Sequence, residues 1–189
     1  VAAAACAPAV ASSPDGAADA AKQFRVPDNY TAIVVQSLSD PTFPFLGTDG
    51  KYHVAYDLEL TNAGPAPATI DKVEVVNAAN PKRVIASFSG TQLIDPTCIY
   101  GDCNRLRRIP SAPADSNAIP SQESRVLFVD FTFDSLDRAP KVVFQHIIGT
   151  GSINPGAKTP SPIDYLVTPF DISAGTPRVI SPPVRVDHW

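Results

Sequence analysis

Apolar and polar side chains alternate strictly between residues 51 and 62, where the chain reads KYHVAYDLELTN. Successive side chains of a β-strand point to opposite faces of its sheet. One face of this segment would carry Tyr52, Val54, Tyr56, Leu58 and Leu60, and the other His53, Ala55, Asp57, Glu59 and Thr61. The alternation therefore predicts a strand that is buried on one face and solvated on the other.

Several other segments have the composition of strands and are separated by turn residues. SRVLFVDFTFD at 124–134 places Leu127, Val129, Phe131 and Phe133 on one face, and PKVVFQHIIGTG at 140–151 is a third strong strand. Weaker strands are expected at 31–38, 68–78, 83–93, 162–173 and 177–184. Seven or eight strands at even spacing, without strand–helix alternation, predict an all-β, antiparallel, immunoglobulin-like β-sandwich.

The apolar periodicity also divides the chain into three parts. Residues 1–26 lack it and are rich in Ala and Pro, so we interpret them as a signal-peptide remnant or a disordered leader. Ala9, Val10 and Ala11 fit a small-x-small cleavage pattern, and the Ala-rich run before Cys6 loosely matches a bacterial lipoprotein site. Residues 27–180 would form the sandwich, and 181–189 a linker to a following domain that this chain lacks.

Composition narrows the classes of partner and compartment. Twenty Pro against ten Gly argue against long helices, and a net charge of −4 argues against nucleic-acid binding. No stretch approaches the roughly 20 apolar residues of a transmembrane helix. We expect a secreted, periplasmic or envelope-associated bacterial protein, with Cys6 as an alternative lipid attachment site.

Two cysteines lie close together in the sequence. Cys98 and Cys103 flank IYGD, a tetrapeptide with turn-forming residues. A disulfide here would close a small loop, as in many extracellular proteins, and would leave Cys6 unpaired. Metal binding and two free thiols are the alternatives.

Motifs for catalysis are missing from the sequence. His53 and Asp57 share a strand face but would lie about 13 Å apart, too far for one metal ion without a bend. His146 has no ligand close to it in sequence, and H-x-H, H-E-x-x-H, C-x-x-C, G-x-S-x-G and phosphate-binding Gly-rich motifs do not occur. The sequence therefore predicts no enzyme and no cofactor or metal.

One basic cluster is a candidate for binding. Arg105, Arg107 and Arg108 lie in NRLRRIP, within an irregular segment from 94 to 122. Such a cluster could bind an anionic polymer such as a cell-wall glycan, or it could simply keep a loop soluble. A hydrolase site in the 94–122 loop is the least favoured reading.

Three segments carry a resemblance to a known family. KYHVAYDLELTNAGPAPATIDKVEVVNAANPKRVIASFSG, IPSQESRVLFVDFTF and PRVISPPVRVDHW follow one another in the chain. In this order they resemble the amino-terminal β-domain that precedes bacterial lysostaphin-like zinc metallopeptidases. The resemblance covers about residues 30–189 and departs from the family at Val186 and Asp187, where Gly is usual.

The resemblance implies an accessory role without catalysis. Of the family's zinc-binding segments only H-x-x-x-D occurs, at His53–Asp57, and it lies in the wrong domain, so no catalytic residue carries over. The main hypothesis is a non-catalytic targeting or positioning module of a secreted peptidase-like protein, with Trp189 at the interface with an adjacent peptidase-like domain. The alternative is a stand-alone extracellular module that binds a protein partner in a surface assembly through a sheet edge.

Overall fold

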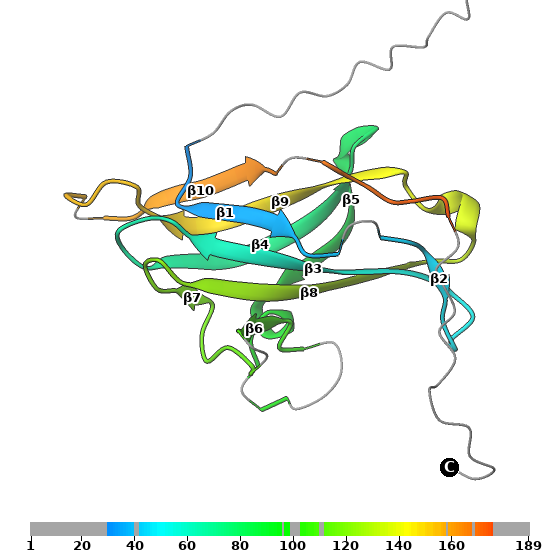
Figure 1. The fold of residues 1–189 in the computed structure, drawn as a ribbon, viewed down its shortest axis with the longest axis horizontal. Coiled ribbons are helices and arrows are strands. Elements are labelled where there is room, and N and C mark those ends of the chain that lie inside the picture. The colour runs from blue at the N-terminus through cyan, green and yellow to red at the C-terminus, as the bar shows by residue number, and fades with distance from the viewer. Residues whose placement is uncertain are drawn as a thin grey trace, which may run out of the picture.

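The chain forms two antiparallel β-sheets that pack face to face, as Figure 1 shows for the computed structural model. The structure describes residues 30–39, 42–95, 97–98, 103–109, 112–157, 159–167 and 169–175. Within these ranges the helical elements are two 3₁₀ turns, at Gly90–Gln92 and Leu136–Arg138. No helix in the described part of the chain is long and apolar enough to cross a membrane.

The first sheet has five strands in the order β1-β3-β8-β6, with β2 also paired to β3. Its strands are β1 (Ile33–Ser37), β2 (Phe45–Leu46), β3 (Tyr52–Asn62), β6 (Leu106–Arg108) and β8 (Ser124–Phe133). The second sheet has six strands in the order β10-β9-β4-β5, with β11 paired to β9 and β7 to β4. Its strands are β4 (Ala68–Asn77), β5 (Asn80–Ser89), β7 (Ala118–Ile119), β9 (Val142–Gly151), β10 (Ser161–Leu166) and β11 (Phe170–Asp171).

The predicted all-β sandwich is confirmed, but the predicted number of strands was too low. The sequence predicted seven or eight strands, and the described residues contain eleven. Three of the additional strands, β2, β6 and β7, have only two or three residues, too few for a period of two to be visible. The segment 162–173 divides into β10 and β11. The leader at 1–26 with Cys6, the expected strand at 177–184 and the linker at 181–189 with Trp189 lie outside the described residues.

The core fills the space between the two sheets with alternate side chains of each long strand. Val54, Tyr56, Leu58 and Leu60 of β3 are at most 3% exposed, as the alternation predicted. The facing positions of the second sheet include Ile70, Val73, Val75 and Ile147, which are fully buried. Burying each such side chain contributes about 1.5–3 kcal/mol, so the sequence alternation itself drives the sheets together.

The two central strands of the second sheet come unusually close at one point. The register of β4 against β9 shifts between Ile70 and Lys72, which marks a β-bulge. A Cβ atom at Gly149 would collide there with the carbonyl oxygen of Thr69. Glycine is therefore required on β9 where the bulged strand passes.

The outer edge of β5 is long and exposed but not regular. Its pairing with β4 shifts on both sides of Val76, and Pro81 lies in the strand. Lys82 and Arg83 are exposed on it. Bulges, proline and positive charge are features that keep sheet edges from pairing with other chains.

The predicted disulfide is present. Cys98 and Cys103 are joined, with 6.3 Å between their Cα atoms. Asn104, at a positive φ of 53°, closes the same turn, because its side-chain amide donates to the carbonyls of Asp95 and Cys98.

Asn62 fixes the end of β3 from inside the protein. Its Nδ2 donates to the carbonyl oxygens of Ala66 and Ile119 at 2.8 Å each, and its Oδ1 accepts from the N–H of Gly64 at 2.9 Å. The residue is 0% exposed, so water cannot replace these bonds. One side chain thus holds both the 62–67 turn and β7.

We expect Asn62→Ala to lower the free energy of unfolding by about 3 kcal/mol, because two buried backbone groups and one partly buried carbonyl lose their partner. Urea denaturation of both proteins measures the loss. Thr132→Ala, which changes an exposed residue of β8, is the control and should change the stability by less than about 0.5 kcal/mol. Equal effects of the two substitutions would contradict this role of Asn62.

Candidate functional site

A short ridge at one end of the sandwich is formed by β2, which lies at the right-hand end in Figure 1. Phe45 pairs with His53 and Leu46 pairs with Tyr52, at the start of β3. The turn between the strands is tight: the N–H of Gly47 donates to the carbonyl of Lys51 at 2.8 Å. We call Phe45 and Leu46 the β2 ridge.

An apolar hollow of about 500 Å³ lies on one side of the β2 ridge. Besides the ridge it is lined mainly by Tyr52, Leu136, Pro140 and Ile172. Phe45, Leu46 and Leu136 are 43%, 62% and 52% exposed. Large apolar side chains gathered around a hollow are typical of a surface that another molecule covers. We call this site the end hollow.

A polar cluster lies on the other side of the β2 ridge. His53 places Nδ1 3.0 Å from Oδ1 of Asp130 on β8, and Nε2 3.2 Å from Oδ1 of Asp49 in the turn. Its ring stacks on Phe45 with 5.5 Å between the ring centroids. A Cβ atom at Gly47 would lie 2.6 Å from the imidazole, so glycine at this position makes room for the cluster.

The charges of this polar cluster stabilise one another. Partial burial opposes the charge on His53, but hydrogen bonds to Asp130 and Asp49 outweigh it and raise the pKa of the imidazole. The backbone N–H of Lys51 and the His53 side chain lower the pKa of Asp49. The protonated ring can donate to both carboxylates at once, so its charged form ties the turn to β8.

His146 has a similar arrangement on the outer face of the second sheet. Its Nδ1 lies 2.9 Å from Oε2 of Glu74 on β4, and its Nε2 lies 2.7 Å from Oδ1 of Asp164 on β10. The described residues contain no group of three or more His, Cys, Asp and Glu side chains placed to hold a metal ion. Each of these two histidines therefore acts as a bridge between neighbouring strands.

The structure does not bring His53 and Asp57 together. The partners of His53 are Asp49 and Asp130, and the Asp57 carboxyl is a separate, partly buried group whose pKa burial raises. The partner on β8 comes from 77 residues away in the sequence, so local spacing could not reveal it.

The predicted basic cluster lies on and beside β6, which forms the edge of the first sheet opposite to β1. Arg105 lies over the ring of Phe88 and Arg107 over the ring of Phe128, with 4.9 and 5.5 Å to the ring centroids. Arg108 is 3.8 Å from a carboxylate oxygen. Each guanidinium group thus has a contact within the protein, and binding of an anionic polymer here stays a prediction.

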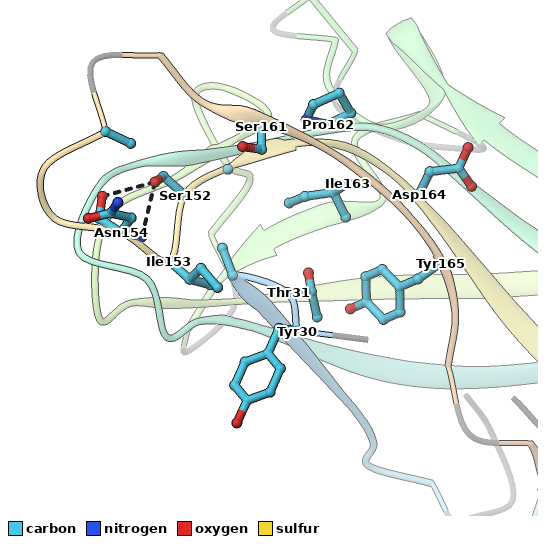
Figure 2. Close-up of a pocket in the computed structure, with 13 residues that line it drawn as sticks. Tyr30, Thr31, Ser152, Ile153, Asn154, Ser161, Pro162, Ile163, Asp164 and Tyr165 are labelled. Carbon is cyan, nitrogen blue, oxygen red and sulfur yellow. Dashed lines mark hydrogen bonds between the residues drawn. The ribbon is translucent and has the colours of Figure 1, made fainter. Parts of the chain in front are cut away.

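A second hollow, of about 400 Å³, lies where β1 begins and the turn from β9 leads into β10 (Figure 2). Ser152 and Asn154 bond to each other across this turn. In Figure 2 the side chains of Tyr30 and Asp164 point away from its middle. Its polar groups therefore hold the turn together more than they present a binding surface.

The β2 ridge was not among the predicted elements, although the sequence carries a signal for it. The apolar pair Phe45-Leu46 is followed by GTDG and then directly by the clearest strand. An apolar pair, a Gly-containing turn and a strand together indicate a hairpin. Leu136 could not be found in this way, because only the fold brings its 3₁₀ turn beside β2.

Comparisons with known proteins do not assign a family. No protein-family model matches the chain, and a search of curated proteins found no match. A solved structure, described as the X-ray structure of Northeast Structural Genomics Consortium target SoR45, superimposes with a TM-score of 0.44 and 11% sequence identity. The match covers 84% of this chain and 99% of that one.

We expect Asp130→Asn to lower the pKa of His53, because a neutral amide stabilises the imidazolium less than a carboxylate does. NMR titration of the imidazole signals measures this pKa. Asp134→Asn, an exposed carboxylate that lies 3.3 Å from Arg138, is the matched control and should leave the pKa of His53 unchanged.

The raised pKa of His53 also makes the stability of the folded protein depend on pH. The pKa of His53 is higher in the folded protein than in the unfolded chain. The interactions of His53 therefore contribute fully to the free energy of unfolding below the unfolded pKa of about 6.5. The contribution is lost as the pH rises through the folded pKa. His53→Gln should therefore destabilise the protein at pH 5.5 and have a smaller effect at pH 8.5, as measured by urea denaturation. A larger effect at pH 8.5 would refute the bridging role.

Proposed function

We propose that this protein is a non-catalytic docking module of a secreted peptidase-like protein, and that it positions a neighbouring domain through the β2 ridge and the end hollow. The observation that carries the proposal is the exposure of Phe45, Leu46 and Leu136 around one apolar hollow. Gly175, at the end of the described residues, also lines this hollow.

The docking surface has the anatomy of a small protein–protein interface. Its apolar centre can bury three large side chains, each worth up to about 1.5–3 kcal/mol when fully covered. His53, Asp49 and Asp130 form a charged rim on one side of it. An apolar centre with a polar rim gives affinity from the centre and orientation from the rim.

Association with a peptidase-like domain rests on the ordered resemblance of the three sequence segments. The disulfide and the lack of a membrane-spanning helix among the described residues are compatible with a secreted or periplasmic location. The second candidate function is a stand-alone extracellular interaction module. The same exposed apolar centre favours it, and the two functions differ in whether the docked surface belongs to the same polypeptide.

Site-specific photocrosslinking tests this proposal in the envelope of the cell that makes the protein. We expect a benzophenone amino acid at Leu46 to give one defined adduct, because the ridge lies within an interface. Mass spectrometry of the adduct identifies the docked surface, either in a following domain or in another protein. Val84, which is 46% exposed on β5, is the control position and should give no defined adduct. The same adducts at both positions, or none at Leu46, would refute docking at the ridge.

The non-catalytic part of the proposal is tested on the purified chain. We expect a metal content far below one equivalent and no hydrolysis of peptides or peptidoglycan, because the histidines bridge carboxylates on different strands. Elemental analysis and peptide-release assays measure the two quantities. Stoichiometric zinc together with turnover would overturn the accessory role and leave the photocrosslinking result to be judged separately.

A further inference from the structure

A separate hollow of about 310 Å³ opens at the edge where β1 faces the chain between β10 and β11. Val35 and Ser37 of β1 line one side of it, and Val167 and Phe170 line the other. Gln145 of β9 also lines it and is only 1% exposed. This edge hollow therefore reaches from the surface into the space between the two sheets.

Gln145 occupies a core position with an amide that is only half satisfied. Its Nε2 donates to the hydroxyl of Tyr56 at 2.7 Å, while its Oε1 has no partner among the described residues. Exchanging the amide oxygen and nitrogen would still leave one end unpaired. A buried polar atom without a partner costs about 1–3 kcal/mol. Gln145 lines the edge hollow, so a donor bound there could supply the partner that its amide lacks.

The backbone of β1 adds further polar groups to the edge hollow. The N–H of Leu38 and the carbonyl of Ala32 bond to residues at the two ends of the β3 pairing. Bonding alternates along an antiparallel strand. The N–H and C=O groups of Ile33, Val35 and Ser37 consequently point away from β3, toward the free edge of the sheet.

Contacts close this free edge on both sides of the hollow. The Tyr165 hydroxyl donates to the carbonyl of Ile33. Beyond the other end of β1, the N–H of Ser173 donates to the carbonyl of Thr42 at 2.8 Å. Between these contacts no other described strand pairs with the outward-facing edge at Val35 and Ser37, over about 7 Å of strand. A long strand therefore cannot pass along the edge, but a short one can enter it.

We propose that the edge hollow binds the short, extended end of another polypeptide chain. One peptide residue pairs with the N–H and C=O of Val35, a second reaches Ser37, and a peptide amide bonds to Gln145. A peptide backbone offers donors and acceptors at the spacing that an open strand edge requires. Val167 and Phe170 form the apolar wall of the hollow, and the limited space beside them suits peptide residues with small side chains. This site is independent of the β2 ridge.

Nuclear magnetic resonance titration of the full chain with acetyl-trialanine N-methylamide tests the proposal. We expect shifts of the backbone amides of Val35 and Ser37 and of the side-chain amide of Gln145, at millimolar peptide. The same tripeptide with methylated amide nitrogens cannot donate hydrogen bonds, so it should bind about tenfold more weakly. No shifts with the first peptide, or equal binding of both, would overturn the proposal.

Two variants separate the backbone and side-chain parts of the site. Val35→Pro removes an N–H that β3 does not use, which edge strands tolerate, and should weaken tripeptide binding about tenfold. Gln145→Leu removes the amide at similar size and should also weaken it. Unchanged affinity in both variants would place the peptide elsewhere and refute the site. Photocrosslinking at Leu46 is unaffected by either result.

Discussion

The pairing of β3 with β8 is the constraint on which the rest of this structure depends. It runs from Tyr52 to Thr61 without a shift in register. Because side chains alternate, a slip by one residue would turn Val54 and its neighbours to solvent and the polar face inward. The same register places His53 diagonally across from Asp130 and directs Tyr56 toward the second sheet. The core, the polar cluster and the Tyr56–Gln145 contact all follow from it.

The parts of the fold that could be predicted are those in which one strand repeats its pattern often enough. The long strands β3, β4, β8 and β9 each span ten or more residues, and buried and less buried positions alternate regularly along most of β3 and β8. The two residues of β2 cannot show any period, and their role depends on pairing with β3. The end hollow needs Leu136 and Ile172 as well, which only the tertiary structure brings together. The fold class could therefore be predicted from the sequence, whereas the proposed docking surface could not.

The polar residues show the same limit more sharply. The sequence pairs His53 with Asp57 because they are four positions apart, yet neighbours in a sheet lie across strands, and the partner of His53 on the adjacent strand is Asp130. Gln145 shares its strand face with Val143 and Ile147, which are both buried. Applying the alternation to β9 as strictly as to β3 would have placed a polar amide in the core. That signal was present in the sequence and was not used.

The two sheets end in edges of opposite character, and this difference limits how the molecule can assemble with copies of itself. A neighbouring strand would need a straight, regular edge to continue the second sheet. The edge of β5 does not offer one, because it contains bulges, Pro81 and positively charged side chains. On the β1 side, the contacts at Ile33 and Thr42 leave an opening only a few residues long. Growth of the second sheet beyond β5 is thus hindered, and growth of the first sheet beyond β1 is limited to a short segment. These two edges therefore limit the ways in which copies of the protein could join through their sheets.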